Sequence, residues 1–200
     1  MTNIKFEIGQ TGLKCFLIGN SHNQAPQINL NSPKLLILPA HHILMENINI
    51  READLNDLDI LLTFQQGMVD AERPFDSTLK PGPLYAYSVA EIIEAANSAM
   101  FVAETGTEII GCGYVRIDES KPHLKHRQHA HLGLMYVVPA HRGKGVNKRI
   151  IDALKQWARE RDIMEIRLDV YAPNTSAIRA YEKVGFAGHL LTMRMNLNEE

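Results

Sequence analysis

One stretch near residue 140 restricts the fold of this chain more than any other part of the sequence. Residues 129–138 have the composition of a strand, and a turn with two glycines, Gly143 and Gly145, follows them. The turn leads into a predicted helix over residues 148–161. Its apolar residues recur at helical spacing: Ile150, Ile151, Leu154 and Ala158. A strand that passes through a short turn into a helix is typical of a sheet with helices packed on it, so we expect an α/β or α+β fold.

The rest of the chain after residue 47 alternates in the same way. Strands are predicted over residues 48–51, 100–104, 108–117, 165–171 and 189–197. Helices are predicted from Asp54 to near Met68, from Ser88 onward, and over residues 175–184. The first of these helices is expected to carry Leu55, Leu58 and Leu62 on one face. A loop broken by prolines is expected over residues 70–83.

The N-terminal segment, residues 1–44, differs from the rest because it is poor in charge and rich in Asn. Residues 15–18 and 35–38 are apolar runs with the length of short strands. We therefore predict two parts, residues 1–44 and residues 45–200. The first part is either a strand pair or dimerisation arm, so that a homodimer is one expectation, or an appendage without a role in the fold.

Composition excludes several classes of function. The net charge of -2 and the pI near 6.5 give no electrostatic basis for binding nucleic acid or a membrane surface. The chain has no apolar run near the roughly 18 residues of a membrane helix, and its start does not resemble a secretion signal. Two cysteines, Cys15 and Cys112, fit a reducing compartment. The sequence thus predicts a cytoplasmic protein.

The glycine-rich turn has the properties of an anion site. Backbone N–H groups at a helix start are unpaired, and the helix dipole favours negative charge there. Arg142, Lys144 and Lys148 add positive charge. The sequences of the nucleoside-triphosphate loop and of the dinucleotide-binding turn are both absent. From these residues alone, a phosphate site and a plain connecting turn both remain open.

The same turn resembles the acyl-CoA pyrophosphate loop of the GCN5-related N-acetyltransferases, which reads Gln/Arg-x-x-Gly-x-Gly/Ala. Arg142 and Gly145 match this pattern, whereas Asn147 departs from it. A second stretch resembles the family's N-x-x-A-x-x-x-Y-x-x-x-G-F. Its matching residues are Asn174, Ala177, Tyr181, Gly185 and Phe186. The two motifs stand in the family's order, and the resemblance covers residues 48–197.

The resemblance implies a mixed, mostly antiparallel, twisted sheet flanked by about four helices and splayed at the CoA site. The splay would separate strand 129–138 from strand 165–171. The pantetheine arm would lie in it, and a backbone N–H near Met135 would hold the thioester oxygen. The implied cofactor-binding residues are Met135, Tyr136, Val137, Arg142, Gly143, Lys144, Gly145, Val146, Asn147, Lys148 and Asn174.

The resemblance also implies catalytic roles. Tyr181, which on helical spacing alone is a core aromatic, would protonate the leaving CoA thiolate. His131 stands where some members carry a catalytic base, although it is also simply one of several exposed histidines. The amine substrate would enter under the loop over residues 70–83. Glu72 and Asp76 in this loop are rival bases and substrate-binding residues. The spacing of the histidines between residues 123 and 131 does not fit a metal site, so we expect no metal.

These features together predict an N-acetyltransferase. It would move an acetyl group from acetyl-CoA to a primary amine of a small molecule or peptide, by direct transfer in a ternary complex. The alternative from another class is a non-catalytic acyl-CoA-binding sensor or regulatory module. The fold and the donor site do not identify the acceptor.

Overall fold

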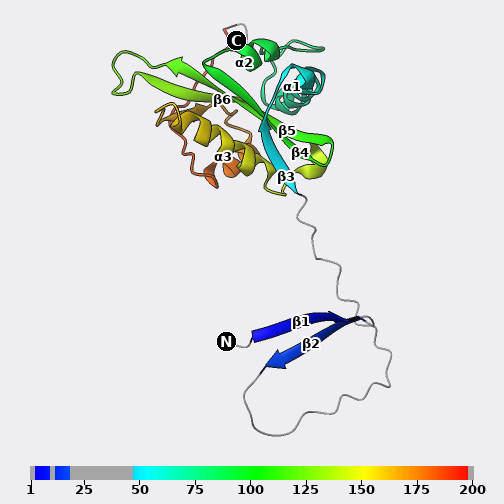
Figure 1. The fold of residues 1–200 in the computed structure, drawn as a ribbon. Coiled ribbons are helices and arrows are strands. Elements are labelled where there is room, and N and C mark those ends of the chain that lie inside the picture. The colour runs from blue at the N-terminus through cyan, green and yellow to red at the C-terminus, as the bar shows by residue number, and fades with distance from the viewer. Residues whose placement is uncertain (1–2, 10–11, 19–46, 198–200) are drawn as a thin grey trace. The chain divides into compact units, whose positions relative to one another are not determined.

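The computed structural model describes residues 3–9, 12–18 and 47–197, and the chain divides into two compact units, residues 1–42 and 43–200. In the first unit, β1 (Asn3–Gly9) pairs antiparallel with β2 (Gly12–Ile18) (Figure 1). The strand predicted at 15–18 is therefore the end of a longer one. The strand predicted at 35–38 and the domain boundary predicted at residue 45 lie outside the described residues.

A mixed five-stranded sheet organises the second unit. Its strands are β3 (Ile48–Glu52), β4 (Ser98–Thr105), β5 (Glu108–Glu119), β6 (Gln128–Val137) and β7 (Ile166–Leu168). They lie side by side in chain order. Neighbours from β3 to β6 are antiparallel, and only β7 runs parallel to its neighbour. The predicted fold class is confirmed.

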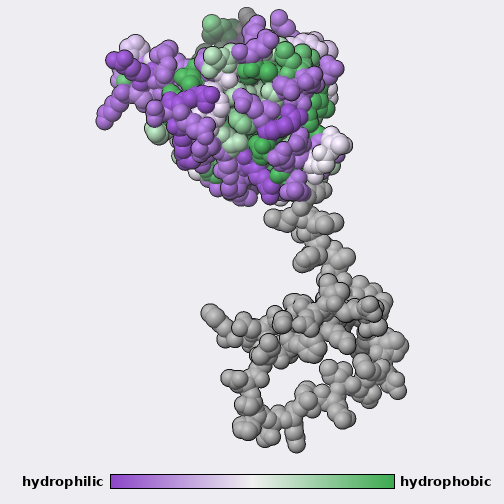
Figure 2. Space-filling view, in the orientation of Figure 1, coloured by the Kyte–Doolittle hydropathy of each residue, from purple (hydrophilic) through white to green (hydrophobic). Residues whose placement is uncertain are grey.

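Helices cover both faces of this sheet (Figure 1). They are α1 (Leu58–Glu72), α2 (Val89–Glu94), α3 (Val146–Arg159) and α4 (Thr175–Glu182). The buried side chains form two cores: α3 packs on one face through Ile150 and Leu154, while α1 and α2 pack on the other through Leu61 and Ile92. Hydrophilic side chains cover most of the surface seen in Figure 2, as expected once the apolar faces are buried.

The start of α1 differs from the predicted helix. Asp54 caps as expected, since its carboxylate accepts from the N–H of Asn56, but residues Leu55–Asp57 form a 3-10 turn before α1 begins. This turn changes which side chains face the sheet. Of the three predicted leucines, Leu58 and Leu62 are partly buried and pack against the core, whereas Leu55 is exposed. The buried positions of α1 are Leu61, Phe64, Gln65 and Val69. The helix also continues to Glu72 instead of ending near Met68.

The prediction of a strand over residues 189–197 was wrong. Leu191, Met193 and Met195 alternate as in a strand, but they are 68%, 87% and 84% exposed. Within the described residues, no backbone hydrogen bond joins this segment to the sheet. An alternating pattern needs a partner strand to become a ladder, and none of the described strands pairs with this segment.

No helix in the described ranges is long and apolar enough to cross a membrane. The cytoplasmic location stays a prediction.

Candidate functional site

The sheet opens where β6 extends beyond the end of its shorter partner β7. The parallel pairing joins Ala130 to Ile166, His131 to Arg167 and Leu132 to Leu168, and it stops there. Residues 133–137 of β6 have no strand partner on the β7 side in the described part of the chain. The predicted splay is therefore present, and it leaves a row of backbone N–H and C=O groups for a ligand to pair with.

A β-bulge lies within this open stretch. The register between β5 and β6 shifts between Cys112 and Tyr114, so that Leu134 and Met135 together oppose Gly113. Leu134 has a φ of 46°, which is unusual for a residue with a side chain. The bulge was not predicted. Its one signal is Gly133, where a Cβ would lie 2.4 Å from the ring of Tyr114.

The turn after β6 requires its two glycines. Gly143 and Gly145 have φ values of 76° and 81°, in the left-handed region that favours glycine. A Cβ at either position would meet no atom within 4 Å, so the space beside the backbone is open. Gly145 caps α3, whose first N–H groups have no helical acceptor. This backbone fits a phosphate or pyrophosphate group.

Two of the predicted cationic side chains at the turn already have partners. The Nε of Arg142 donates to the carbonyl of Val137 at 3.0 Å, and its guanidinium lies 5.8 Å from the ring centre of Tyr136. The Nζ of Lys148 lies 2.6 Å from a carboxylate oxygen of Asp152. Arg142 thus ties the turn to the end of β6.

Tyr181 lies on α4, which begins as predicted. The side chain of Asn174 accepts from the N–H of Ala177 at 3.2 Å and caps this helix. The half-buried ring of Tyr181 meets Phe186 edge to face at 5.9 Å. Burial, and next the charge of Glu72, raise the pKa of Tyr181 to about 12. Its hydroxyl therefore keeps its proton at neutral pH, as a general acid must.

His131 lies on β6 before the bulge, with Arg116 on β5 and Arg167 on β7 at the paired positions. Both arginines have carboxylate partners, Asp118 and Glu165. The role of His131 as the base stays a prediction. In the described ranges, no group of three His, Cys, Asp or Glu side chains is placed to hold a metal ion.

Glu72 and Asp76, for which the same roles were predicted, have different surroundings in the structure. Asp76 accepts from the hydroxyl of Thr78 at 2.6 Å and from both terminal nitrogens of Arg194 at 3.1 Å. The Thr78 hydrogen bond and then Arg194 hold the pKa of Asp76 well below its usual range. Asp76 is thus occupied, and the partner Arg194 was not predicted.

Glu72, in contrast, is half-buried, and burial raises its pKa. Among the described residues, its carboxylate has no hydrogen-bond or ion-pair partner. Phe75 follows directly in the next turn, and its ring stacks on Tyr171 with 6.4 Å between centres. The end of α1 is therefore joined to the segment after β7, beside the opening in the sheet.

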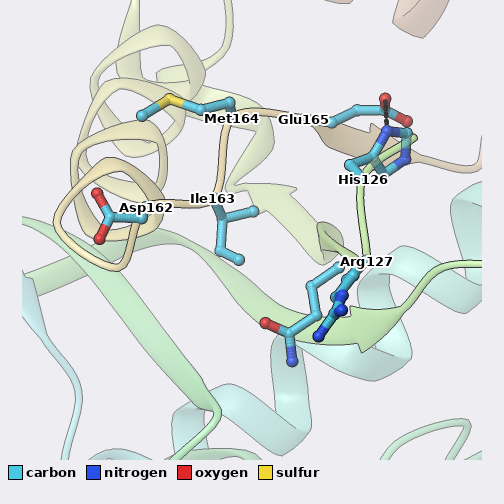
Figure 3. A pocket seen from close by; sticks show the side chains of 7 residues that line it. His126, Arg127, Asp162, Ile163, Met164 and Glu165 are labelled. Atoms are coloured by element: carbon cyan, nitrogen blue, oxygen red, sulfur yellow. Dashed lines mark ion pairs between the residues drawn. The ribbon is translucent and has the colours of Figure 1, made fainter. Parts of the chain in front are cut away.

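A separate depression of about 460 Å³ lies at the other end of β6 (Figure 3). Its lining residues are His126, Arg127, Gln128, Asp162, Ile163, Met164 and Glu165. The Nδ1 of His126 lies 3.2 Å from Glu165, so these groups already pair with each other. The ten residues of β6 separate this depression from the glycine turn. It is therefore not the candidate site.

Known proteins resemble this chain in sequence and fold. It is 29% identical over 90 residues to N-alpha-acetyltransferase 30 of Saccharomyces cerevisiae, which is 45% of this chain and 49% of that protein. The chain thus spans about half the length of this curated relative. A protein of Bacillus halodurans matches 74% of the chain and 99% of its own length, with a TM-score of 0.67 and 22% identity.

A crystal structure of a predicted acetyltransferase with acetyl-CoA from Clostridium acetobutylicum has a TM-score of 0.57 and 21% identity, over 76% of this chain and 98% of its own. Both structures show the fold of the second unit. The model of the "Acetyltransferase (GNAT) family" matches residues 66–186, which is more than half of the chain. This protein therefore belongs to the GNAT acetyltransferase family.

Proposed function

We propose that this protein is an acetyl-CoA-dependent N-acetyltransferase that acts on primary amines. The observation that carries the proposal is the juxtaposition of two backbone features. The edge of β6 at residues 133–137 is open, and a left-handed turn at the start of α3 follows within the next ten residues. An acyl-pantetheine arm can pair with the open edge while the phosphates of CoA bind the N–H groups at the turn.

On the donor side, Met135, Tyr136 and Val137 supply the strand edge, and the turn from Arg142 to Lys148 supplies the phosphate site. The bulge at Leu134 turns backbone groups out of regular pairing with β5. A backbone N–H near Met135 is then available to the thioester oxygen as it becomes an oxyanion. The acetyl-CoA in the structure from Clostridium acetobutylicum supports this choice of donor.

The reaction is a direct transfer within a ternary complex. The lone pair of the neutral amine attacks the carbonyl carbon of the thioester and forms a tetrahedral intermediate. When the C–S bond breaks, the thiolate of CoA takes a proton from the hydroxyl of Tyr181. This hydroxyl makes no hydrogen bond to any described residue, so it is available to a ligand.

On the acceptor side, we propose a primary amine of a small molecule or peptide. The relative from Saccharomyces cerevisiae, named as an N-alpha-acetyltransferase, supports amine acetylation. Identity at this level does not carry over the acceptor itself, since the fold and the donor site are shared among enzymes with different acceptors. A homodimer through residues 1–44 stays a prediction.

Two measurements test the proposal. Acetyl-CoA should raise the melting temperature of the protein, because a ligand that binds only the folded state stabilises it. A panel of primary amines with acetyl-CoA should release free thiol. A melting curve that millimolar CoA does not move would refute the donor site. A clear shift without thiol release for any amine would instead indicate the non-catalytic sensor.

A further inference from the structure

The side chain of Glu72 continues the face of α1 that covers the open end of β6. Phe64, Met68 and Glu72 are spaced four residues apart and therefore share one stripe of the helix. The ring of Phe64 lies 5.1 Å from that of Tyr136. A Cβ at Gly67 would lie 2.6 Å from the hydroxyl of Tyr136, so the helix packs closely there. Glu72, the last residue of α1, thus follows the part of the helix that packs on Tyr136.

Three tyrosines from other segments share the surroundings of Glu72. They are Tyr87 before α2, Tyr171 after β7, and Tyr181 on α4. Burial raises the pKa of each, and the charge of Glu72 is the next largest cause in the same direction. The stacking of Phe75 on Tyr171 independently joins the end of α1 to the opening. The charge of Glu72 therefore acts on the proposed acid Tyr181, and the end of α1 lies beside the segment after β7.

The cationic side chains near Glu72 are engaged elsewhere. The Nε of Arg73 lies 3.2 Å from Asp70, and its Nη1 donates to the carbonyl of Lys80 at 2.8 Å. Arg194 pairs with Asp76. Glu72 is thus a half-buried carboxylate without a partner in the described part of the chain. Such a group gains from a cation that arrives with a ligand.

We infer that Glu72 binds the ammonium group of the acceptor and takes its proton, an inference that rests on the proposed N-acetyl transfer. One N–H bond of the ammonium breaks, and a bond from that proton to a carboxylate oxygen of Glu72 forms. The freed lone pair attacks the thioester carbon, and the thiolate later takes its proton from Tyr181. The tetrahedral intermediate loses its own ammonium proton, which restores Tyr181, and the proton on Glu72 passes to solvent.

His131 is less suited to this role. An ammonium group that approached His131 would come between Arg116 and Arg167, the residues at its paired positions. Like charges repel it there, although Asp118 and Glu165 offset part of that repulsion. At Glu72 the acceptor instead meets a carboxylate with the rings of Phe75, Tyr87 and Tyr171 nearby. Aromatic faces favour cations and also pack against apolar groups, so the acceptor class is a protonated primary amine with an aromatic or apolar body.

The test compares two acceptors of nearly equal shape. These are 2-phenylethylamine and its 2,2-difluoro analogue, whose amine loses its proton at much lower pH. Glu72→Gln should lower kcat/KM for 2-phenylethylamine at neutral pH by roughly 10²–10⁴-fold, and much less for the analogue, which arrives without the proton. His131→Gln is the matched control, since it also replaces a candidate base with an amide, and it should not distinguish the two amines.

The pH profile gives a second measurement on the same variants. In the wild type, kcat/KM for 2-phenylethylamine should be level at neutral pH and fall in acid as Glu72 gains its proton, above the ordinary pKa of 4.5 because burial raises it. In Glu72→Gln it should instead rise about tenfold per pH unit with the free amine. The other charged groups on Glu72's own segment and around the three tyrosines are Asp70, Arg73, Asp76, Arg116, Asp169 and Arg194, and all are unchanged in the variant.

Different outcomes refute different claims. Equal losses for both amines at all pH values, or wild-type rates, would overturn the role of Glu72. If the wild type acetylates other amines but neither of these two, the inferred acceptor class is wrong. Acetyl-CoA should shift the melting temperature of Glu72→Gln as it shifts that of the wild type, which confirms that the variant is folded. Absence of that shift in the wild type would instead refute the proposed function.

Discussion

The donor side of the proposed active site is formed by backbone groups, whereas the acceptor side is formed by side chains. The donor side consists of backbone: the open edge of β6, the bulge at Leu134, and the turn with Gly143 and Gly145. The acceptor side consists of side chains from distant segments, as in the contact of Asp76 with Arg194, 118 residues further along the chain. A site made of backbone needs particular residue types at fixed spacing, whereas a side-chain cluster imposes no spacing on the sequence.

Because of this difference, substitutions on the two sides should have different effects. On the donor side, a substitution acts through backbone conformation or through the hydroxyl of the proposed acid Tyr181. On the acceptor side, a substitution outside Glu72 acts through the position of a loop, so that its effects should be smaller and confined to the acceptor. Variants on the two sides should therefore differ in the size of their effects on turnover, CoA affinity and KM for the amine.

Removal of the hydroxyl of Tyr181 should have the largest effect. Tyr181→Phe keeps the ring and its contact with Phe186, so the protein should fold and bind acetyl-CoA nearly as well as the wild type. The thiolate would lose its proton donor, and kcat should fall by roughly 10²–10⁴-fold. Steady-state kinetics and a thermal shift with acetyl-CoA measure the two quantities. Wild-type turnover, with chemistry limiting the rate, would leave Tyr181 as a packing residue.

The contrast between the two sides explains what the sequence could predict. Gly143, Gly145 and the cap Asn174 have conformational roles that only a few residue types can fill, and all three lie where expected. The bulge at Leu134 was missed because the glycine beside it, Gly133, also fits an ordinary strand. The pairing of Asp76 with Arg194 depends on how the whole chain folds, and no local pattern shows it.

The wrong strand over residues 189–197 has a related cause. Alternating residues record only which side chains can share a face, and a strand forms only where another backbone can pair with it. Likewise, the apolar residues of α1 fit more than one helical stripe. The 3-10 turn at Leu55–Asp57 sets which of these stripes faces the sheet. In this turn the N–H of Asp54 donates a hydrogen bond to the carboxylate of Asp57.

A bulky side chain at Gly145 should have the next largest effect. Gly145→Val places a branched residue at a φ of 81° and fills the open space beside the anion site, so affinity for CoA should fall well over tenfold. Gly106→Val is the matched control, because Gly106 has a φ of 60° and open space in the turn between β4 and β5. It should lower the melting temperature and leave CoA affinity intact. Equal affinity losses in both variants would show that general destabilisation is the cause.

The ion pair on the acceptor side should have a smaller effect. Arg194→Ala frees Asp76 and the loop that carries Phe75, so KM for the amine should rise several-fold while CoA affinity stays constant. The double variant Asp76→Arg with Arg194→Asp should recover part of that loss. An unchanged KM would mean that the pair does not position the loop.

The same pair predicts a pH dependence of stability. The pKa of Asp76 is lower in the folded protein than its ordinary value of 3.8, through Thr78 and then Arg194. Its contribution is therefore complete above pH 3.8 and is lost as the pH falls through the lower folded value. The difference in melting temperature between the wild type and Arg194→Ala should thus be present at neutral pH and shrink in acid. A difference that persists unchanged below that range would point to lost packing rather than lost charge.

Removal of residues 1–44 should have the smallest effect. A chain that begins at Met45 keeps β3, whose Ile48 carbonyl accepts from Arg149 on α3 at 3.0 Å and whose Asn49 side chain donates to Glu104 at 2.8 Å. It also keeps every residue assigned to the donor and acceptor sides. We therefore expect a folded protein with unchanged CoA affinity and kcat, measured by thermal shift and thiol release. Size-exclusion chromatography of both lengths tests the dimerisation arm separately, since loss of a dimer with unchanged activity would assign that role to residues 1–44. An insoluble truncated chain would show instead that these residues complete the fold of the second unit.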